Sequence, residues 1–248
     1  MSAYEALAQS YDGLTRDIPY EQMLTYMEAL LRRHGVQPET VLDLACGTGS
    51  MSVLLAKRGY KVLASDLSED MLAMAWEKAS ELEYNRPYFI CQPMERLQLP
   101  YTVDWVLCCL DSLNYVTDPA DCRRAVARVY ESLSPGGVFL FDLNTPEKLR
   151  GLDGQIFLDE NEDAYCVWRA EFDEAENICY YGMDLFQRQG GSWRRSFEEH
   201  REYAYTVAQL TEYLQEAGFE TVEVYGDQRF EAPETGEQRV YFLARKGT

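Results

Sequence analysis

Apolar positions recur along the chain in two rhythms, one typical of helices and one typical of buried strands. The first helical pattern runs from Tyr20 to His34 and is followed by Gly35, a helix stop signal. Short apolar runs predict strands over 41–45, 61–65, 88–91, 104–110 and 138–143. Helical segments are predicted between them over 50–58, over 68–83 and from 119 onward. This alternation predicts a mostly parallel sheet with helices on both faces.

The pattern changes after residue 150. Three strand-like stretches, 165–172, 178–187 and 193–205, follow one another without helices and predict an antiparallel insertion. Thr206 and Gln209 form a capping-box pattern, so a helix is expected to start there and end at Gly218. The stretches 221–225 and 239–245 are expected to form a closing hairpin.

Three parts are therefore expected. Residues 1–35 form an N-terminal helical lid, residues 36–150 and 206–248 form an α/β core with a seven-stranded sheet, and residues 151–205 form an antiparallel β insertion that covers the substrate site.

Charge narrows the range of partners. The chain has 42 Asp and Glu residues against 23 Lys and Arg residues, a formal net charge of −19. Such a surface repels nucleic acid, and the densest basic segment, around Arg194 and Arg195, is mixed with glutamates. No apolar run approaches the ~20 residues of a membrane span, and the N-terminus lacks a signal-peptide layout. We expect a cytoplasmic protein, a monomer or homodimer, that binds neither nucleic acid nor membranes.

The seven cysteines give no sign of a metal site or a disulfide framework. Their number is odd, no CxxC motif occurs, and only His34 and His200 could add imidazole ligands. Reduced cysteines that serve as small buried hydrophobic residues are expected instead.

The candidate chemistry lies where predicted strands end. Gly47 and Gly49 follow the first core strand and allow the backbone to approach a ligand closely. Asp66 ends the second strand, 19 residues after Gly47, where a carboxylate can accept both hydroxyls of a ribose. Together these features predict a nucleoside-type ligand. A dinucleotide fingerprint has glycine where this chain has Ser52, and the charge of Asp43 suits a cationic ligand better than a diphosphate.

Three segments resemble the motifs of class I S-adenosylmethionine-dependent methyltransferases. They are V-L-D-L-A-C-G-T-G at 41–49, S-D-L-S-E-D-M-L at 65–72 and L-S-P-G-G-V-F-L-F-D at 133–142. The likeness is greatest to a small-molecule group of Firmicute-type bacteria, which share the Y-D-x-L…D-I-P-Y segment at 11–20 and D-S-L-N-Y at 111–115. The resemblance implies a Rossmann-like fold, S-adenosyl-L-methionine as cofactor and a small-molecule methyl acceptor.

The resemblance also implies roles for individual residues around the cofactor. Ala45 and Gly47 would line its methionine part, Asp66 would hold the ribose, and Leu67 would pack on adenine. The other residues expected at the cofactor are Tyr11, Tyr20, Asp43, Gly49, Pro93, Met94 and Leu110. Many members have Asp-Met where this chain has Pro93-Met94, so an acceptor for the adenine amino group is missing. Gln92 and Glu95 are the candidates to replace it.

The sequence says less about the residues that would bind the methyl acceptor. Methyl transfer by in-line displacement requires alignment of the reactants, and a hydroxyl or ammonium acceptor also requires a base. Asp111, Tyr115 and His200 are the candidate catalytic residues, and each has a structural alternative: a turn cap, a pocket wall and a surface or hydrogen-bonded structural histidine, respectively. Asp142 is a second strand-end carboxylate that could act as the base, and Asn114 and Asn144 are candidate positioning groups.

The function that follows is transfer of a methyl group to a nitrogen or oxygen atom of a small molecule. A non-catalytic module that binds adenosylmethionine and an NAD-dependent oxidoreductase remain the alternatives.

Overall fold

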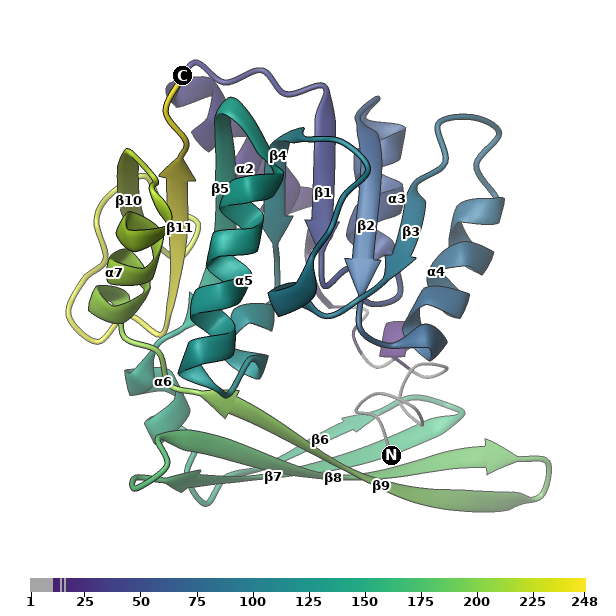
Figure 1. Ribbon diagram of the computed structural model, residues 1–248. Coiled ribbons are helices and arrows are strands. Elements are labelled where there is room, and N and C mark those ends of the chain that lie inside the picture. The colour runs from purple at the N-terminus through teal and green to yellow at the C-terminus, as the bar shows by residue number, and fades with distance from the viewer. Residues whose placement is uncertain (1–10, 14, 16) are drawn as a thin grey trace.

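The computed structural model describes residues 11–13, 15 and 17–248, so the other residues of the expected lid lie outside it. Two separate sheets organise the described chain (Figure 1). The larger has the strand order β10-β11-β5-β4-β1-β2-β3. Its strands are β1 (Thr40–Leu44), β2 (Lys61–Asp66), β3 (Tyr88–Cys91), β4 (Val103–Cys108), β5 (Leu133–Asn144), β10 (Thr221–Gly226) and β11 (Arg239–Arg245). Only β11 pairs antiparallel with both of its neighbours, which confirms a mostly parallel seven-stranded sheet.

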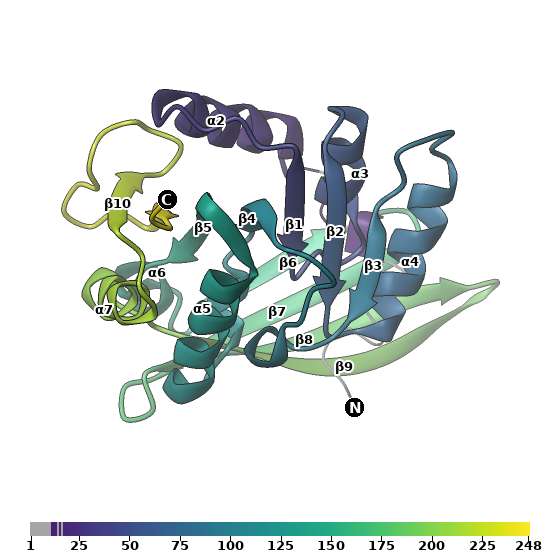
Figure 2. The same ribbon diagram turned by 45° about the horizontal axis from the view of Figure 1, so that its top comes forward.

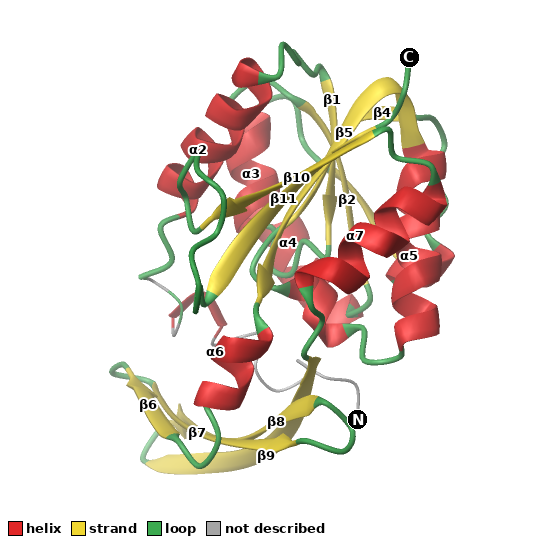
Figure 3. Ribbon diagram, turned by 90° about the vertical axis from the view of Figure 1, so that its left-hand side faces the viewer, coloured by secondary structure: helices red, strands yellow, loops and turns green. Residues whose placement is uncertain are grey.

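Helices cover both faces of this sheet. The described chain contains α2 (Tyr20–Arg33), α3 (Ser50–Lys57), α4 (Glu69–Ser80), α5 (Pro119–Ser132), α6 (Pro146–Gly151) and α7 (Val207–Ala217), with the 3-10 helices η1 (Met94–Arg96) and η2 (Ser112–Tyr115). Of these, α6 lies beyond the edge of the sheet, towards the small sheet, rather than on a face (Figure 3). Figure 3 shows α2 and α3 on one face and α5 and α7 on the other. Strand β4 is buried on both faces, which explains why it is apolar apart from Asp104. Trp105 and Leu107 pack towards α2 and α3, while Val106 and Cys108 pack towards α5.

The second sheet is the predicted insertion, and it has one strand more than expected. Its order is β6-β7-β8-β9, with all pairs antiparallel. The strands are β6 (Ile156–Glu160), β7 (Ala164–Asp173), β8 (Ile178–Gln189) and β9 (Ser192–Tyr203). Strand β6 was not predicted, because all five of its residues are exposed and no alternation of buried and exposed positions marks it. The sheet runs across the carboxyl ends of β1 and β2 (Figures 1 and 2).

Most predicted boundaries agree with the structure to within three residues. The capping box of Thr206 and Gln209 is present, and the Ser68 side chain caps α4 by accepting from the Met71 N–H. The expected start of β5 was wrong, because the strand begins at Leu133, within the segment expected to be a turn, rather than at Val138. Smaller differences are that α4 ends at Ser80 rather than near residue 83, and that β4 ends at Cys108 rather than at Leu110. In the described part of the chain, no helix is both long and apolar enough to cross a membrane.

Candidate cofactor and acceptor site

A cavity of about 770 Å³ lies at the carboxyl edge of the large sheet. Its wall comes from the ends of β1, β2 and β4, from η1 and η2, from the N-terminal residues Tyr11 and Tyr20, and from Trp168 on β7. The volume falls within the 300–1,000 Å³ typical of small-molecule sites. Every residue expected at the cofactor lines this cavity except Gly49, which lies in the same loop.

The loop after β1 has a backbone that only certain residues adopt without strain. Gly47 and Gly49 have φ values of 53° and 75°, and Ala45 shares this left-handed region at 57°. A Cβ on Gly49 would lie 2.8 Å from the Cβ of Ala75, so a glycine is required there for packing. A Cβ on Gly47 would meet nothing within 4 Å, so the backbone at Gly47 is accessible to a ligand.

Asp66 connects this loop to the end of β2. Its Oδ2 accepts the Gly47 N–H and its Oδ1 accepts the Ser68 N–H, both at 2.8 Å. Leu67 follows with 69% of its surface exposed, an unusual position for a leucine that would suit the apolar face of a base. Asp66 therefore has a role in loop structure that the sequence did not reveal, beside the ribose contact that was expected.

Asp43 is buried at the end of β1, and its carboxylate accepts a hydrogen bond from the Ser52 hydroxyl. This contact explains the serine in place of a third glycine, because the buried carboxylate requires a donor. Burial raises the pKa of Asp43 to about 7. A cation bound in the adjoining cavity would favour the ionised form.

At the expected adenine end, the structure separates the two candidates for the missing acceptor. The Gln92 side chain holds the loop after η1, since its Nε2 donates to the Gln98 carbonyl and its Oε1 accepts the Gln98 N–H. Both residues line the cavity, and Glu95 forms an ion pair with the neighbouring, exposed Arg96 at 3.9 Å. Glu95 is therefore the better placed of the two.

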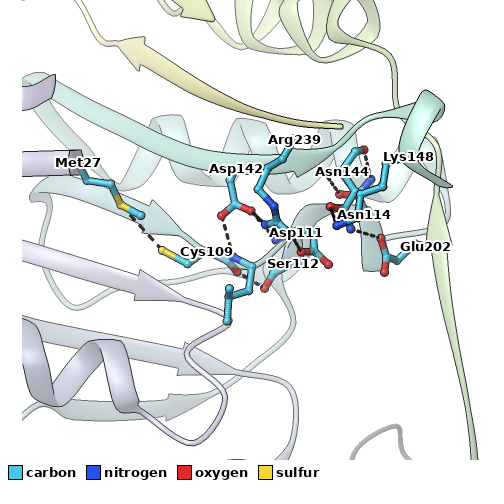
Figure 4. Close-up of polar contacts among 11 residues, drawn as sticks. Met27, Cys109, Asp111, Ser112, Asn114, Asp142, Asn144, Lys148, Glu202 and Arg239 are labelled. Atoms are coloured by element: carbon cyan, nitrogen blue, oxygen red, sulfur yellow. Dashed lines mark hydrogen bonds and ion pairs between the residues drawn. The ribbon is translucent and has the colours of Figure 1, made fainter. Parts of the chain in front are cut away.

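The turn after β4 is held by a carboxylate that the sequence did not assign to it. Leu110 and Asp111 both have positive φ, 57° and 51°, and both N–H groups donate to Asp142 at 2.7 and 3.0 Å. The Arg239 guanidinium lies between Asp142 and Asp111, forms ion pairs with both, and reaches Asp111 Oδ1 at 2.6 Å (Figure 4). The Asp111 side chain thus pairs with Arg239 and makes no cap hydrogen bond to η2.

Tyr115 and His200, far apart in sequence, lie together in the structure. Their ring centroids are 6.2 Å apart, and the indole of Trp168 lies 5.6 Å from the imidazole. Tyr115 and Trp168 line the cavity, while His200 is 1% exposed and packs against them. His200 Nε2 lies 3.3 Å from a carboxylate oxygen of Glu198, two residues earlier on the same face of β9. Sequence reasoning missed Trp168 and Glu198.

A buried polar network joins the small sheet to the core beside this site (Figure 4). The Asn144 side chain donates to Glu202 at 2.9 Å and accepts from Lys148 Nζ at 2.7 Å. The Asn114 amide bridges the carbonyls of Asn144 and Tyr203. Burial, reinforced by the charge of Asp111, raises the pKa of Glu202 to about 8, and burial lowers the pKa of Lys148.

These raised carboxyl pKa values predict that the free energy of unfolding falls as the pH rises from 5.5 to 8. Folded Glu202 retains a proton up to pH about 8, whereas the unfolded chain releases it near pH 4.5. Between those values the folded state binds more protons than the unfolded state, so stability falls by about 1.4 kcal/mol per pH unit for each such group. Urea unfolding at pH 5.5, 6.5, 7.5 and 8.5 measures the slope.

The Glu202→Gln variant tests whether Glu202 causes this dependence of the free energy of unfolding on pH. Its slope should be flatter than that of the unmodified chain, whereas Glu171→Gln, which removes an exposed carboxylate of β7, should keep the full slope. Equal slopes in all three proteins would contradict the role given to Glu202.

A family model, curated relatives and solved structures that are similar to this chain are described as methyltransferases. A family model described as "Methyltransferase domain" matches residues 41–137. A protein of Geobacillus sp. (strain WCH70), named "Putative methyltransferase", is 33% identical over 98% of this chain and 99% of its own length. The crystal structure of an S-adenosylmethionine-dependent methyltransferase from Clostridium acetobutylicum superposes with a TM-score of 0.87 at 28% identity, covering 100% of both chains. The sugar N-methyltransferase KedS8 from Streptoalloteichus sp. shares the fold, with a TM-score of 0.77, 22% identity, and coverage of 100% and 94%.

Proposed function

Since this chain belongs to the class I S-adenosylmethionine-dependent methyltransferases, we propose that it methylates a nitrogen or oxygen atom of a small molecule. The observation that carries the proposal is the shape of the cavity. The strand-end residues expected at the cofactor line the same cavity as Asp111, Tyr115 and Trp168 of the small sheet. A partly enclosed space of this kind suits a small acceptor rather than a polymer. KedS8, which shares the fold, is named for the methylation of sugar nitrogen.

The residues at the strand ends fit adenosylmethionine. Asp66 would accept the ribose hydroxyls, and the exposed side chain of Leu67 would cover the adenine ring. The open backbone at Gly47 and the Leu110 carbonyl would contact the amino-acid part, where Tyr11 and Tyr20 would close over the carboxylate.

When bound, the cofactor supplies an activated methyl group on a sulfonium sulfur. The protein's own task is to align the acceptor with that group and to exclude water. Tyr115 and Trp168 would orient the acceptor, and Asp111 would accept its proton. His200, paired with Glu198, would position Tyr115 from behind the cavity wall.

We further propose that the described residues ahead of α2, namely 11–13, 15 and 17–19, and the insertion, residues 151–205, cover the site, whereas α2 packs on a face of the large sheet. Two contacts support this arrangement. Asp12 accepts from the Thr48 hydroxyl of the glycine loop at 2.6 Å and pairs with Lys78 at 2.7 Å, so the N-terminal segment is fastened next to the cofactor loop. Trp168 brings the insertion to the cavity.

Two measurements test the function. Adenosylmethionine or adenosylhomocysteine at ~100 times its dissociation constant should stabilise the protein by roughly 2.7 kcal/mol, and NAD should not. Incubation with methyl-labelled adenosylmethionine and a fractionated cell extract should then place the label in a low-molecular-weight product.

The outcomes separate the alternatives. Label in protein or RNA would contradict the proposed acceptor class. Cofactor binding without any labelled product would favour a non-catalytic binding module. An Asp66→Ala sample serves as the control for labelling that does not depend on the site.

A further inference from the structure

The wall of the cavity is strongly acidic. Among the described residues, six carboxylic side chains and one guanidinium line it. The carboxyl groups belong to Asp43, Asp66, Glu95, Asp111, Asp118 and Asp121, and the guanidinium belongs to Arg239. Adenosylmethionine carries a sulfonium, an ammonium and one carboxylate, so its single net positive charge offsets only part of this negative charge. Even when Asp43, whose pKa is raised by burial to about 7, is counted as neutral, the cavity retains an excess of negative charge.

Arg239 does not provide a site for an anionic acceptor. Its guanidinium is already shared between the carboxylates of Asp142 and Asp111. An acceptor with a carboxylate or phosphate would have to displace one of them and would face the remaining carboxylates without a counter-charge. The charge distribution therefore disfavours acidic acceptors.

The acceptor half of the cavity does offer contacts for a cation. Arg239 reaches Oδ1 of Asp111, and a carboxylate can accept several further hydrogen bonds. Tyr115 and Trp168 line the same cavity, and aromatic faces attract cations. A carboxylate beside aromatic walls matches an ammonium group on an apolar body.

We propose that the methyl acceptor is an amine that enters the cavity as a cation, with the Asp111 carboxylate as its counter-charge and with Tyr115 and Trp168 around its hydrocarbon part. This inference rests on the proposed function and narrows the acceptor atom to nitrogen.

The chemistry balances with the groups present. The ammonium gives one proton to the Asp111 carboxylate, which leaves a lone pair on nitrogen. The nitrogen–carbon bond then forms as the carbon–sulfur bond breaks, and the electron pair of the broken bond stays on sulfur. The product leaves as a methylated ammonium, and Asp111 returns its proton to water at the cavity mouth.

Four compounds with one ring and different charges test the proposal by direct binding. Benzylamine, benzyl alcohol, benzoate and benzyl phosphate are titrated calorimetrically into the full chain saturated with adenosylhomocysteine. Benzylamine should bind at least about tenfold more tightly than the other three. Asp111→Asn, which keeps a neutral acceptor for Arg239, should weaken benzylamine by at least about tenfold and change benzyl alcohol by less than about twofold.

Two controls accompany these titrations. Glu171→Gln removes an exposed carboxylate of β7 and should leave all four affinities unchanged. Asp111→Asn should still unfold in a single cooperative thermal transition and should retain its affinity for adenosylhomocysteine, which excludes a general loss of structure.

The inference is overturned if benzoate or benzyl phosphate binds as tightly as benzylamine, if benzylamine does not bind, or if its affinity is the same in Asp111→Asn. Failure of the proposed function looks different, because adenosylhomocysteine would not bind or no small labelled product would form. An O-methylated product from the labelled extract would keep the proposed function and reject the amine.

Discussion

Replacing Asp66 with alanine should weaken the binding of adenosylmethionine and adenosylhomocysteine by about 10–150-fold. A carboxylate that accepts two ribose hydroxyls makes charge-assisted hydrogen bonds worth roughly 1.5–3 kcal/mol, which corresponds to that range. The structure gives a second reason why cofactor binding should weaken in this variant. Asp66 also fixes the Gly47 and Ser68 N–H groups, so the variant loses order in the loop that contacts the rest of the cofactor.

Calorimetric titration of both ligands into three variants separates these causes. Asp66→Asn keeps an oxygen acceptor but has no charge, so it should lie between the unmodified chain and Asp66→Ala. Asp70→Ala removes an exposed carboxylate in the first turn of α4 and should bind normally. Normal binding by Asp66→Ala would show that the end of β2 does not hold the ribose.

The α/β core could be predicted because its signals are local. A strand covered on both faces is an apolar run, as at β4, and glycines or capping residues mark where the next element begins. Strand β6 gives no such signal, because its side chains are exposed and only pairing with β7 holds it in a sheet. Strand β4 ends before Leu110 because Asp142, which is distant in sequence, accepts the N–H groups of Leu110 and Asp111 and so stabilises the positive φ angles of the turn.

The residues expected at the cofactor could also be predicted from local sequence signals, whereas the arrangement of those expected at the acceptor could not. The residues that line the cofactor half come mostly from consecutive strand ends, so the loop at Gly47 and the acid at Asp66 could be recognised together. The acceptor half combines η2 with β7 and the start of β11. No spacing in the sequence indicates that Trp168 and Tyr115 line one cavity, or that Arg239 pairs with Asp111. These residues come together only when the insertion is folded over the sheet and β11 is paired with β5.

Asp142→Ala should produce the largest loss of stability of any substitution considered, about 3–5 kcal/mol. Asp142 is fully buried, accepts the N–H groups of Leu110 and Asp111, and pairs with Arg239. Alanine would leave two N–H donors and part of a guanidinium charge in the interior without partners, and each carries a desolvation penalty. The turn would also lose the contacts that hold its positive φ angles, so affinity for adenosylhomocysteine should fall although Asp142 does not line the cavity.

A double-mutant cycle with Arg239→Met distinguishes loss of a charge pair from loss of packing. Removal of both partners of a buried pair costs less than removal of one, because no uncompensated charge remains. The free energy of unfolding of Asp142→Ala with Arg239→Met should therefore exceed the additive value by at least about 1 kcal/mol, well outside the scatter of independent sites. Additive effects would mean that Arg239 finds sufficient compensation at Asp111 alone. In that case the turn after β4, rather than the ion pair, would account for the stability that Asp142 provides.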